Sequence, residues 1–407
     1  MKRPLEGVRV LDLTRLIPGP FCTVILADLG AEVIKVEEPV IGDYERQIEP
    51  FQKDMAYRFM MLNRNKKSLG LNLKEEIGRK IFLDLVKKSD VVVDGFRPGV
   101  MSKLALAYDD LKKVNEGLVY CSLSSYGHSG PYSDRVAHDI NILAQIGLLD
   151  LIGPAGGAPV IPGVQLVDTV TALYAVIGIF AALMAREKTG IGQKVDLSMH
   201  DCAFSLMFDS IRYPLAEGRV AQRGRERLMG GLANYNIYES RDGQYMAIGA
   251  LEKKFKDALF RELNLEGFIE EGHSVTDSGV NPEKEAQVKV RLEDLFKQKD
   301  LEEWQEILEP ANVFFSPVTT VAEALEDPQL RFREMIVETD HPTAGRVTQI
   351  GSPLKLSETP GDPERLPAPH LGEHTGEILR SLGVSDEEIN DFAKRGIISG
   401  PLQEVSR

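Results

Sequence analysis

The chain has 407 residues, of which 43% are hydrophobic and 27% are charged, and its formal net charge is −14. This length favours two domains, and the composition is typical of a folded globular protein. The acidic balance argues against nucleic-acid binding, which needs a basic surface. It still permits a polyanionic ligand, because one local basic pocket can hold a phosphate.

The first 125 residues alternate predicted strands and helices. Strands are predicted at Val8–Leu13, Glu32–Glu37 and Lys67–Leu73 and in the runs SDVVVDGF and GLVYCSLSS, with one helix ending at Gly30 and another over about 75–88. This alternation predicts βαβ units and a parallel sheet, whose ligands bind at the carboxyl ends of the strands. No glycine-rich dinucleotide or P-loop motif follows the first strand, so an NAD-dependent dehydrogenase is not expected.

Residues 131–186 are apolar and predicted to be helical, and residues 218–231 form a basic, glycine-rich linker. A hairpin is predicted around Asp242–Gly243, and a helical tail has Ser385 as its N-cap. We therefore predict an N-terminal part of a large domain over 1–217, a small α+β domain over 218–325, and a return segment over 326–407 that completes the large domain.

The cysteines at positions 22, 121 and 202 form no CxxC pair and are expected to be buried thiols in a reducing compartment. The N-terminus has no secretory signal, and the apolar stretch Ala172 to Met184 is too short to span a membrane. That stretch is interpreted as a core helix. We expect a cytoplasmic protein with no membrane or nucleic-acid partner.

Three residues are candidates for catalysis. Asp168 opens an apolar helical run, where it is either a helix N-cap or an oriented base or nucleophile. His138 precedes another apolar run and is either structural or a general acid–base group suited to neutral pH. Glu252 ends a predicted strand and is either a helix-start carboxylate or a partner for a catalytic group.

Cationic residues near the predicted loop ends are candidates for binding phosphate. Arg97 is favoured because Pro98 and Gly99 place it at a turn, where its guanidinium fork can meet a phosphate. Surface cations often have no such role, so we expect about half of the set to matter. The full set is Lys35, Arg64, Lys66, Lys67, Arg97 and Lys103.

Several motifs resemble the family III CoA transferases, which include formyl-CoA transferase and the 2-methylacyl-CoA racemases. The runs are LEGVRVLDLTRLIPGPFCTVILADLGAEVIKVEEP, LNRNKKSLGLNL, SDVVVDGFRPGVMSKL, AREKTGIGQKVDLSMHDC and LGEHTGEIL. The resemblance implies a Rossmann-like large domain built from both chain ends and a smaller inserted domain. It also implies an interlocked homodimer that binds coenzyme A as part of its substrate, with no permanently bound cofactor and no metal.

The resemblance implies two possible activities. In the first hypothesis, a 2-methylacyl-CoA racemase, His138 in AHDIN and Asp168 exchange the α-proton, and Glu252 in GALEKKF supports His138 from the partner subunit. Ile17, where formyl-CoA transferase has a glutamine, favours this activity. The alternative is a CoA transferase that moves CoA between carboxylic acids through an anhydride on Asp168. The opening LDLTR, the later run GDYER, and the run DTVTAL in place of a glycine-rich turn favour the transferase.

A third hypothesis is a CoA-binding subunit without activity of its own. Such a subunit need not keep the aspartate, so the presence of Asp168 argues against it.

Overall fold

The structure is a computed structural model that describes residues 3–268 and 281–400. The chain divides into two compact units. Unit 1 comprises Met1–Ile142, Val164–Leu206 and Asp327–Arg407, and unit 2 comprises Leu143–Gly163 and Met207–Glu326.

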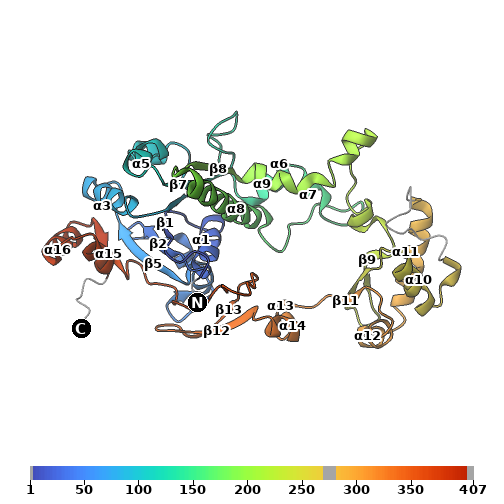
Figure 1. Ribbon diagram of the computed structural model, residues 1–407. Coiled ribbons are helices and arrows are strands. Elements are labelled where there is room, and N and C mark those ends of the chain that lie inside the picture. The colour runs from blue at the N-terminus through green and yellow to red at the C-terminus, as the bar shows by residue number, and fades with distance from the viewer. Residues whose placement is uncertain (1–2, 269–280, 401–407) are drawn as a thin grey trace. The chain divides into compact units, whose positions relative to one another are not determined.

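Unit 1 is built on a seven-stranded sheet in the order β14-β5-β2-β1-β6-β7-β8, in which only the short edge strand β14 is antiparallel to its neighbour (Figure 1). The parallel sheet predicted from the alternating pattern is confirmed. The strands are β14 (Ile398–Ser399), β5 (Lys66–Leu71), β2 (Glu32–Glu37), β1 (Arg9–Asp12), β6 (Val91–Asp94), β7 (Val119–Ser124) and β8 (Lys194–Ser198).

Helices cover both faces of this sheet. Neighbouring residues of a strand point to opposite sides, and in these strands the residues on both sides are apolar and must be buried. Val92 of β6 packs in one core cluster, while Val91 and Val93 pack in the other. The first cluster receives α3 (Glu76–Val86), α4 (Val100–Lys103), α5 (Tyr108–Val114), α15 (Thr375–Ser381) and α16 (Asp386–Lys394). The second receives α1 (Pro18–Asp28) and α8 (Leu166–Thr189).

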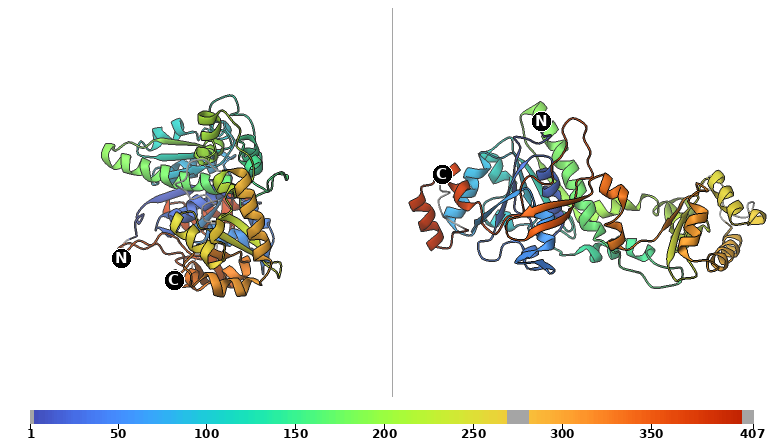
Figure 2. Two further views of the ribbon diagram at one scale, coloured as in Figure 1. Left: turned by 90° about the vertical axis from the view of Figure 1, so that its right-hand side faces the viewer. Right: turned by 90° about the horizontal axis from the view of Figure 1, so that it is seen from below.

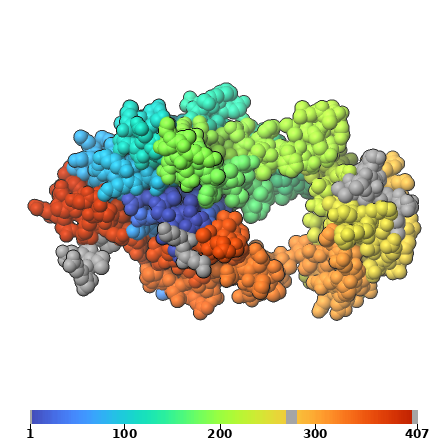
Figure 3. All heavy atoms as spheres, in the orientation of Figure 1, coloured from blue at the N-terminus to red at the C-terminus, as the bar shows by residue number. Residues whose placement is uncertain are grey.

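Both ends of the described chain contribute to unit 1. In Figure 2, α15 and α16 lie beside the N-terminal strands and helices, and Figure 3 shows the red spheres of this part of unit 1 against the blue spheres of the N-terminal part. Ser385 caps α16 with a reciprocal capping box, as predicted. The hairpin of β12 (Ile336–His341) and β13 (Gly345–Ile350), preceded by α14 (Pro328–Phe332), also belongs to this unit.

The prediction that the apolar stretch Ala172 to Met184 is too short to span a membrane is wrong for the helix that contains it, because α8 runs over 24 residues and is long and apolar enough to cross a membrane by length and composition. In the structure one of its faces lies in the core of unit 1, through Ala172, Ala175 and Ile179. This agrees with its interpretation as a core helix.

Unit 2 contains the predicted hairpin, as β9 (Tyr235–Glu239) and β10 (Tyr245–Gly249), with β11 (Phe315–Pro317) as the third strand. Helices α10 (Lys253–Glu262), α11 (Pro282–Phe296) and α12 (Leu301–Leu308) share an apolar core with this sheet. Residues 143–163 and 207–217, which we had assigned to the large domain, group with unit 2 instead. Leu151, Met207, Tyr213 and Ala221 form one apolar cluster that ties these segments together.

Candidate active site

Asp168 lies in the first turn of α8, but it is not the N-cap that one sequence interpretation suggested. Gln165 occupies the N-cap position and makes no capping bond with its side chain. The Asp139 carboxylate supplies the acceptor instead, because Oδ2 receives the backbone N–H of Val167 at 2.7 Å and of Asp168 at 3.2 Å. The Asp168 side chain is therefore not used to cap its own helix.

Burial raises the pKa of Asp168 to about 6, and the neighbouring Asp139 carboxylate contributes to the increase. The Arg58 guanidinium opposes the shift, and the Glu45 carboxylate adds to it. No hydrogen bond from the described residues reaches the Asp168 carboxylate. A half-buried carboxyl group that titrates near neutral pH is typical of an acid–base or nucleophilic group.

His138 directly precedes Asp139, the first residue of α6 (Asp139–Gln145), and its side chain is exposed. The chain here is anchored to the end of β7, because Ser125 Oγ accepts the N–H of Ala137 at 3.3 Å and donates to its carbonyl at 3.2 Å. The backbone N–H of His138 donates to the side chain of Asn141 at 3.1 Å. The Asp139 contact thus ties the segment that carries His138 to the first turn of the helix that carries Asp168.

Glu252 belongs to unit 2, where it is the exposed N-cap residue of α10 and makes no capping bond with its side chain. Its pairing with His138 across two subunits stays a prediction.

Four of the six candidate phosphate-binding cations are already engaged inside the protein. Lys35 and Lys66 have no exposed side-chain surface and are paired with Asp43 at 2.8 Å and Asp12 at 3.2 Å, respectively. Arg64 is buried against Asp28, and Lys67 bridges Glu32 and Glu377. In this structure these four cations are engaged by carboxylates of the fold, and their assignment to CoA phosphates stays a prediction. The pairing could not be predicted from spacing, because the carboxylates come from other segments of the chain.

Arg97 and Lys103 are exposed and remain candidates for phosphate. Arg97 lines a cavity of about 240 Å³ at the ends of β6 and β7, together with His128, Lys194 and Asp94. Burial raises the pKa of Asp94 to about 6, although hydrogen bonds from Phe96 N and from the Tyr120 and Ser122 hydroxyls lower it. Asp94, His128 and Lys194 were not predicted as site residues, although Asp94 directly follows three valines at the end of a buried strand.

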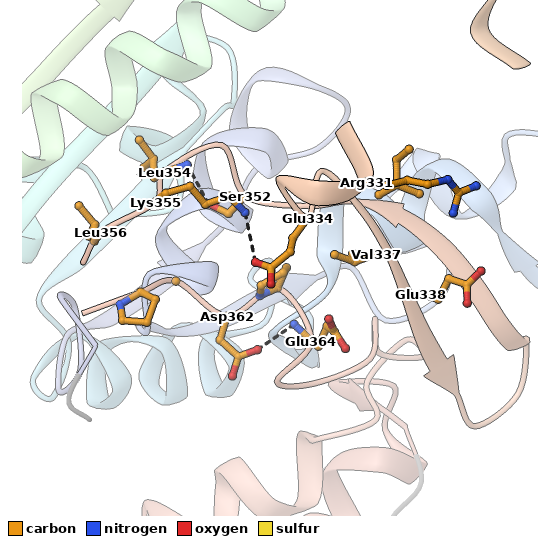
Figure 4. Close-up of a pocket in the computed structure, with 14 residues that line it drawn as sticks. Arg331, Glu334, Val337, Glu338, Ser352, Leu354, Lys355, Leu356, Asp362 and Glu364 are labelled. Carbon is orange, nitrogen blue, oxygen red and sulfur yellow. Dashed lines mark hydrogen bonds and ion pairs between the residues drawn. The ribbon is translucent and has the colours of Figure 1, made fainter. Parts of the chain in front are cut away.

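A second cavity, of about 670 Å³, lies between the β12–β13 hairpin and residues 352–364 (Figure 4). Its lining combines apolar residues with four acidic and two basic side chains, and Glu334 is paired there with Lys355 at 3.5 Å. None of the predicted site residues lines this cavity. Across residues 3–268 and 281–400, no three His, Cys, Asp or Glu side chains are grouped to hold a metal ion.

The chain matches the CoA-transferase family III over residues 5–375. It is 32% identical to human succinyl-CoA:glutarate CoA-transferase, covering 97% of this chain and 90% of the relative. It is 34% identical to human alpha-methylacyl-CoA racemase, covering 99% of each.

A crystal structure of a CaiB/BaiF family protein from Brucella suis has a TM-score of 0.82 and 30% identity, covering 94% of this chain and 100% of that one. These likenesses confirm the resemblance seen in the motifs, and they indicate an enzyme of the racemase or CoA-transferase type that acts on CoA thioesters. The chain belongs to family III of the CoA transferases.

Proposed function

We propose that the protein is a 2-methylacyl-CoA racemase or epimerase, in which Asp168 and His138 exchange the α-proton of the thioester. The observation that carries this proposal is the half-buried carboxyl group of Asp168 in the first turn of α8, which accepts no hydrogen bond from the described residues and whose pKa burial raises to about 6. A racemase needs each catalytic group both to accept and to donate the proton at neutral pH, and a carboxyl group near pKa 6 can do both. The likeness to human alpha-methylacyl-CoA racemase supports the same activity.

In this mechanism the thioester carbonyl acidifies the proton on C2 of the acyl group. One group removes that proton from one face, and the other group returns a proton to the opposite face, which inverts the centre. Asp139 positions both groups, because it follows His138 in the chain and holds the first turn of the helix that carries Asp168. Glu252 would orient His138 from the partner subunit, and Arg97 and Lys103 would hold CoA phosphates.

The second candidate is a CoA transferase. It is favoured by the unbonded carboxylate of Asp168, which has the Arg58 cation among its neighbours. The carboxylate would attack the thioester carbonyl and expel CoA thiolate to form a mixed anhydride. The thiolate would then attack the aspartyl carbonyl, releasing the first acid and leaving an enzyme–CoA thioester. The acceptor carboxylate would repeat these two steps in reverse. The likeness to the succinyl-CoA:glutarate enzyme supports this alternative.

Proton NMR of the purified protein with (2S)-2-methylbutanoyl-CoA in D₂O tests the two candidates, with and without a free carboxylic acid. Entry of deuterium at C2 without any acid supports the racemase. A new thioester that forms only when the acid is added, without exchange at C2, rejects the racemase and supports the transferase.

We further propose that the protein works as a homodimer. Its support is the outer side of α8, where Leu173, Ile177 and Met184 are exposed at helical spacing although they are large and apolar. We propose that a second copy of the chain packs against this apolar side of α8 and buries it. Sedimentation analysis should show a dimer for the wild type and a shift to monomer for Ile177→Glu, whereas a monomeric wild type would reject this proposal.

A further inference from the structure

The loop after β2 is locked in place by ion pairs on both sides of Glu45. Asp43 is paired with the buried Lys35, and its Oδ1 accepts the N–H of Leu16 at 3.2 Å and of Glu45 at 3.1 Å. Arg46 forms a bidentate pair with Glu37, at 2.8 Å for both bonds. The position of Glu45 is therefore set by the ion pairs of Asp43, two residues before it, and of Arg46, directly after it.

Glu45 itself is an unusual carboxylate. Its side chain has no exposed surface, and neither oxygen accepts a hydrogen bond from the described residues. Its counter-charge is Arg58, at the start of α2 (Tyr57–Asn63), whose Nε lies 3.0 Å from Oε2. A buried carboxylate without hydrogen bonds is costly for the fold, and the Arg58 guanidinium is the cation that offsets this cost.

Arg58 is left with binding capacity. Glu45 engages the Nε of Arg58, and the two terminal nitrogens of Arg58 form no bond to a described residue. The Arg58 side chain is 39% exposed. A guanidinium held at one edge, with its outer nitrogens free, can bind a carboxylate through two parallel hydrogen bonds. Arg58 and Glu45 also lie close enough to Asp168 to affect its pKa, in opposite directions.

The ligand near Asp168 is the acyl end of the substrate. The pantetheine arm separates the phosphates of CoA from the thioester carbon, so an anion bound beside Asp168 belongs to the acyl group or to an acceptor acid. We propose that Arg58, oriented by Glu45, binds a free carboxylate of the substrate, and that the enzyme therefore prefers dicarboxylic compounds. This inference rests on the proposed acyl-CoA chemistry at Asp168, and the carboxylate has two sources, an ω-carboxylated acyl-CoA or a dicarboxylic acceptor.

The test compares substrates that differ only by the distal carboxylate. One arm measures deuterium exchange at C2 of 2-methylglutaryl-CoA against 2-methylpentanoyl-CoA. The other arm measures transfer from 2-methylbutanoyl-CoA to glutarate against butanoate. The variants are Arg58→Met, Arg58→Lys, Glu45→Gln and the control Arg395→Met, which removes an exposed arginine paired with Asp391 and not among the charges that act on Asp168.

We expect the wild type to prefer the carboxylated compound in one arm, which identifies the source. Arg58→Met should lower kcat/KM for that compound roughly 10- to 100-fold more than it lowers kcat/KM for the uncharged match, since any effect through the charge on Asp168 is common to both compounds. Arg58→Lys keeps the charge but not the fork and should lose most of the preference, and Glu45→Gln should lose part of it. Arg395→Met should behave as the wild type.

Equal use of both compounds by the wild type, or an equal loss on both in Arg58→Met, overturns the inference while leaving the acyl-CoA activity intact. Calorimetric binding of glutarate separates the two failures. If the wild type turns over no substrate but binds glutarate in an Arg58-dependent manner, the proposed function fails and the anion site stands. If the wild type neither turns over any of the substrates nor binds glutarate, both the proposed function and the anion site are rejected.

Discussion

In unit 1 the Asp12 carboxylate is buried and the Asp168 carboxylate is half-buried, yet their pKa values move in opposite directions. Burial alone raises the pKa of Asp12, but Lys35 and Lys66 lower it well below its usual range, with hydrogen bonds from Thr14 and Thr23. Burial raises the pKa of Asp168 to about 6, the charge with the largest effect on it is another carboxylate, Asp139, and no described donor bonds to it. Burial does not decide the role of a carboxylate; the supply of donors and cations does.

The largest expected effect is on turnover. Asp168→Asn should lower kcat about 10³-fold or more, because the amide neither exchanges a proton nor attacks a thioester at neutral pH. The melting temperature should stay the same or rise, since a desolvated charge is removed. Parallel kinetics and thermal melts check both parts, and a variant that keeps most of its activity would reject Asp168 as the central residue.

Asp12→Asn should act on the fold instead. It leaves the buried Lys66 without its counter-charge, and breaking such a pair costs about 3–5 kcal/mol of unfolding free energy. Urea unfolding of the variant beside the wild type measures this loss. Activity per folded molecule should be retained, and a stability close to the wild type would contradict the assignment of Asp12 to a structural network.

The pH dependence of catalysis should respond to the neighbours of Asp168 in opposite senses. Asp139→Asn removes a negative charge, so the pKa of Asp168 should fall and the acidic limb of the kcat/KM profile should move to lower pH. Arg58→Met removes a positive charge and should move that limb to higher pH. An unchanged limb in both variants would show that Asp168 does not control the profile.

The carboxyl groups of Asp168 and Asp12 should also differ in how they make the free energy of unfolding depend on pH. The folded pKa of Asp168 lies above the usual value of about 3.9, so the folded chain holds a proton that the unfolded chain has released between about pH 4 and 6. The wild type should therefore lose stability, relative to Asp168→Asn, as the pH rises through that window. Asp12 has a lowered pKa, so its contribution is complete above pH 4 and is lost only in stronger acid. Denaturant titrations from pH 4 to 7 check the difference.

The smallest effect is expected at the edge of the Asp12 network. The Thr23 hydroxyl donates to Asp12 at 2.6 Å and accepts from Lys66 at 2.7 Å. Thr23→Val should cost about 1–3 kcal/mol, because it leaves two charged groups with one bond fewer each. The kcat should not change, and a fall in kcat without a fall in stability would link this network to catalysis.

The sequence by itself determined the regular part of the molecule. Alternating apolar runs predicted the parallel sheet, the hairpin followed from Asp242–Gly243, and Ser385 indicated the start of α16. These features depend on residues close together in the chain, so local periodicity and capping patterns are enough to find them. The runs that resemble the family III CoA transferases are also local, so they could be read directly from the chain.

Tertiary structure decided which charges are free. Lys35 and Lys66 resembled phosphate ligands in the sequence, but carboxylates from other segments bury and neutralise them. Asp139 lies 29 residues from Asp168 and still caps its helix, and Arg58 finds its partner in Glu45 of a preceding loop. Partners of this kind are brought together only when the chain folds. Neither the neutralised lysines nor the exposed edge of the Arg58 guanidinium could therefore be predicted from spacing.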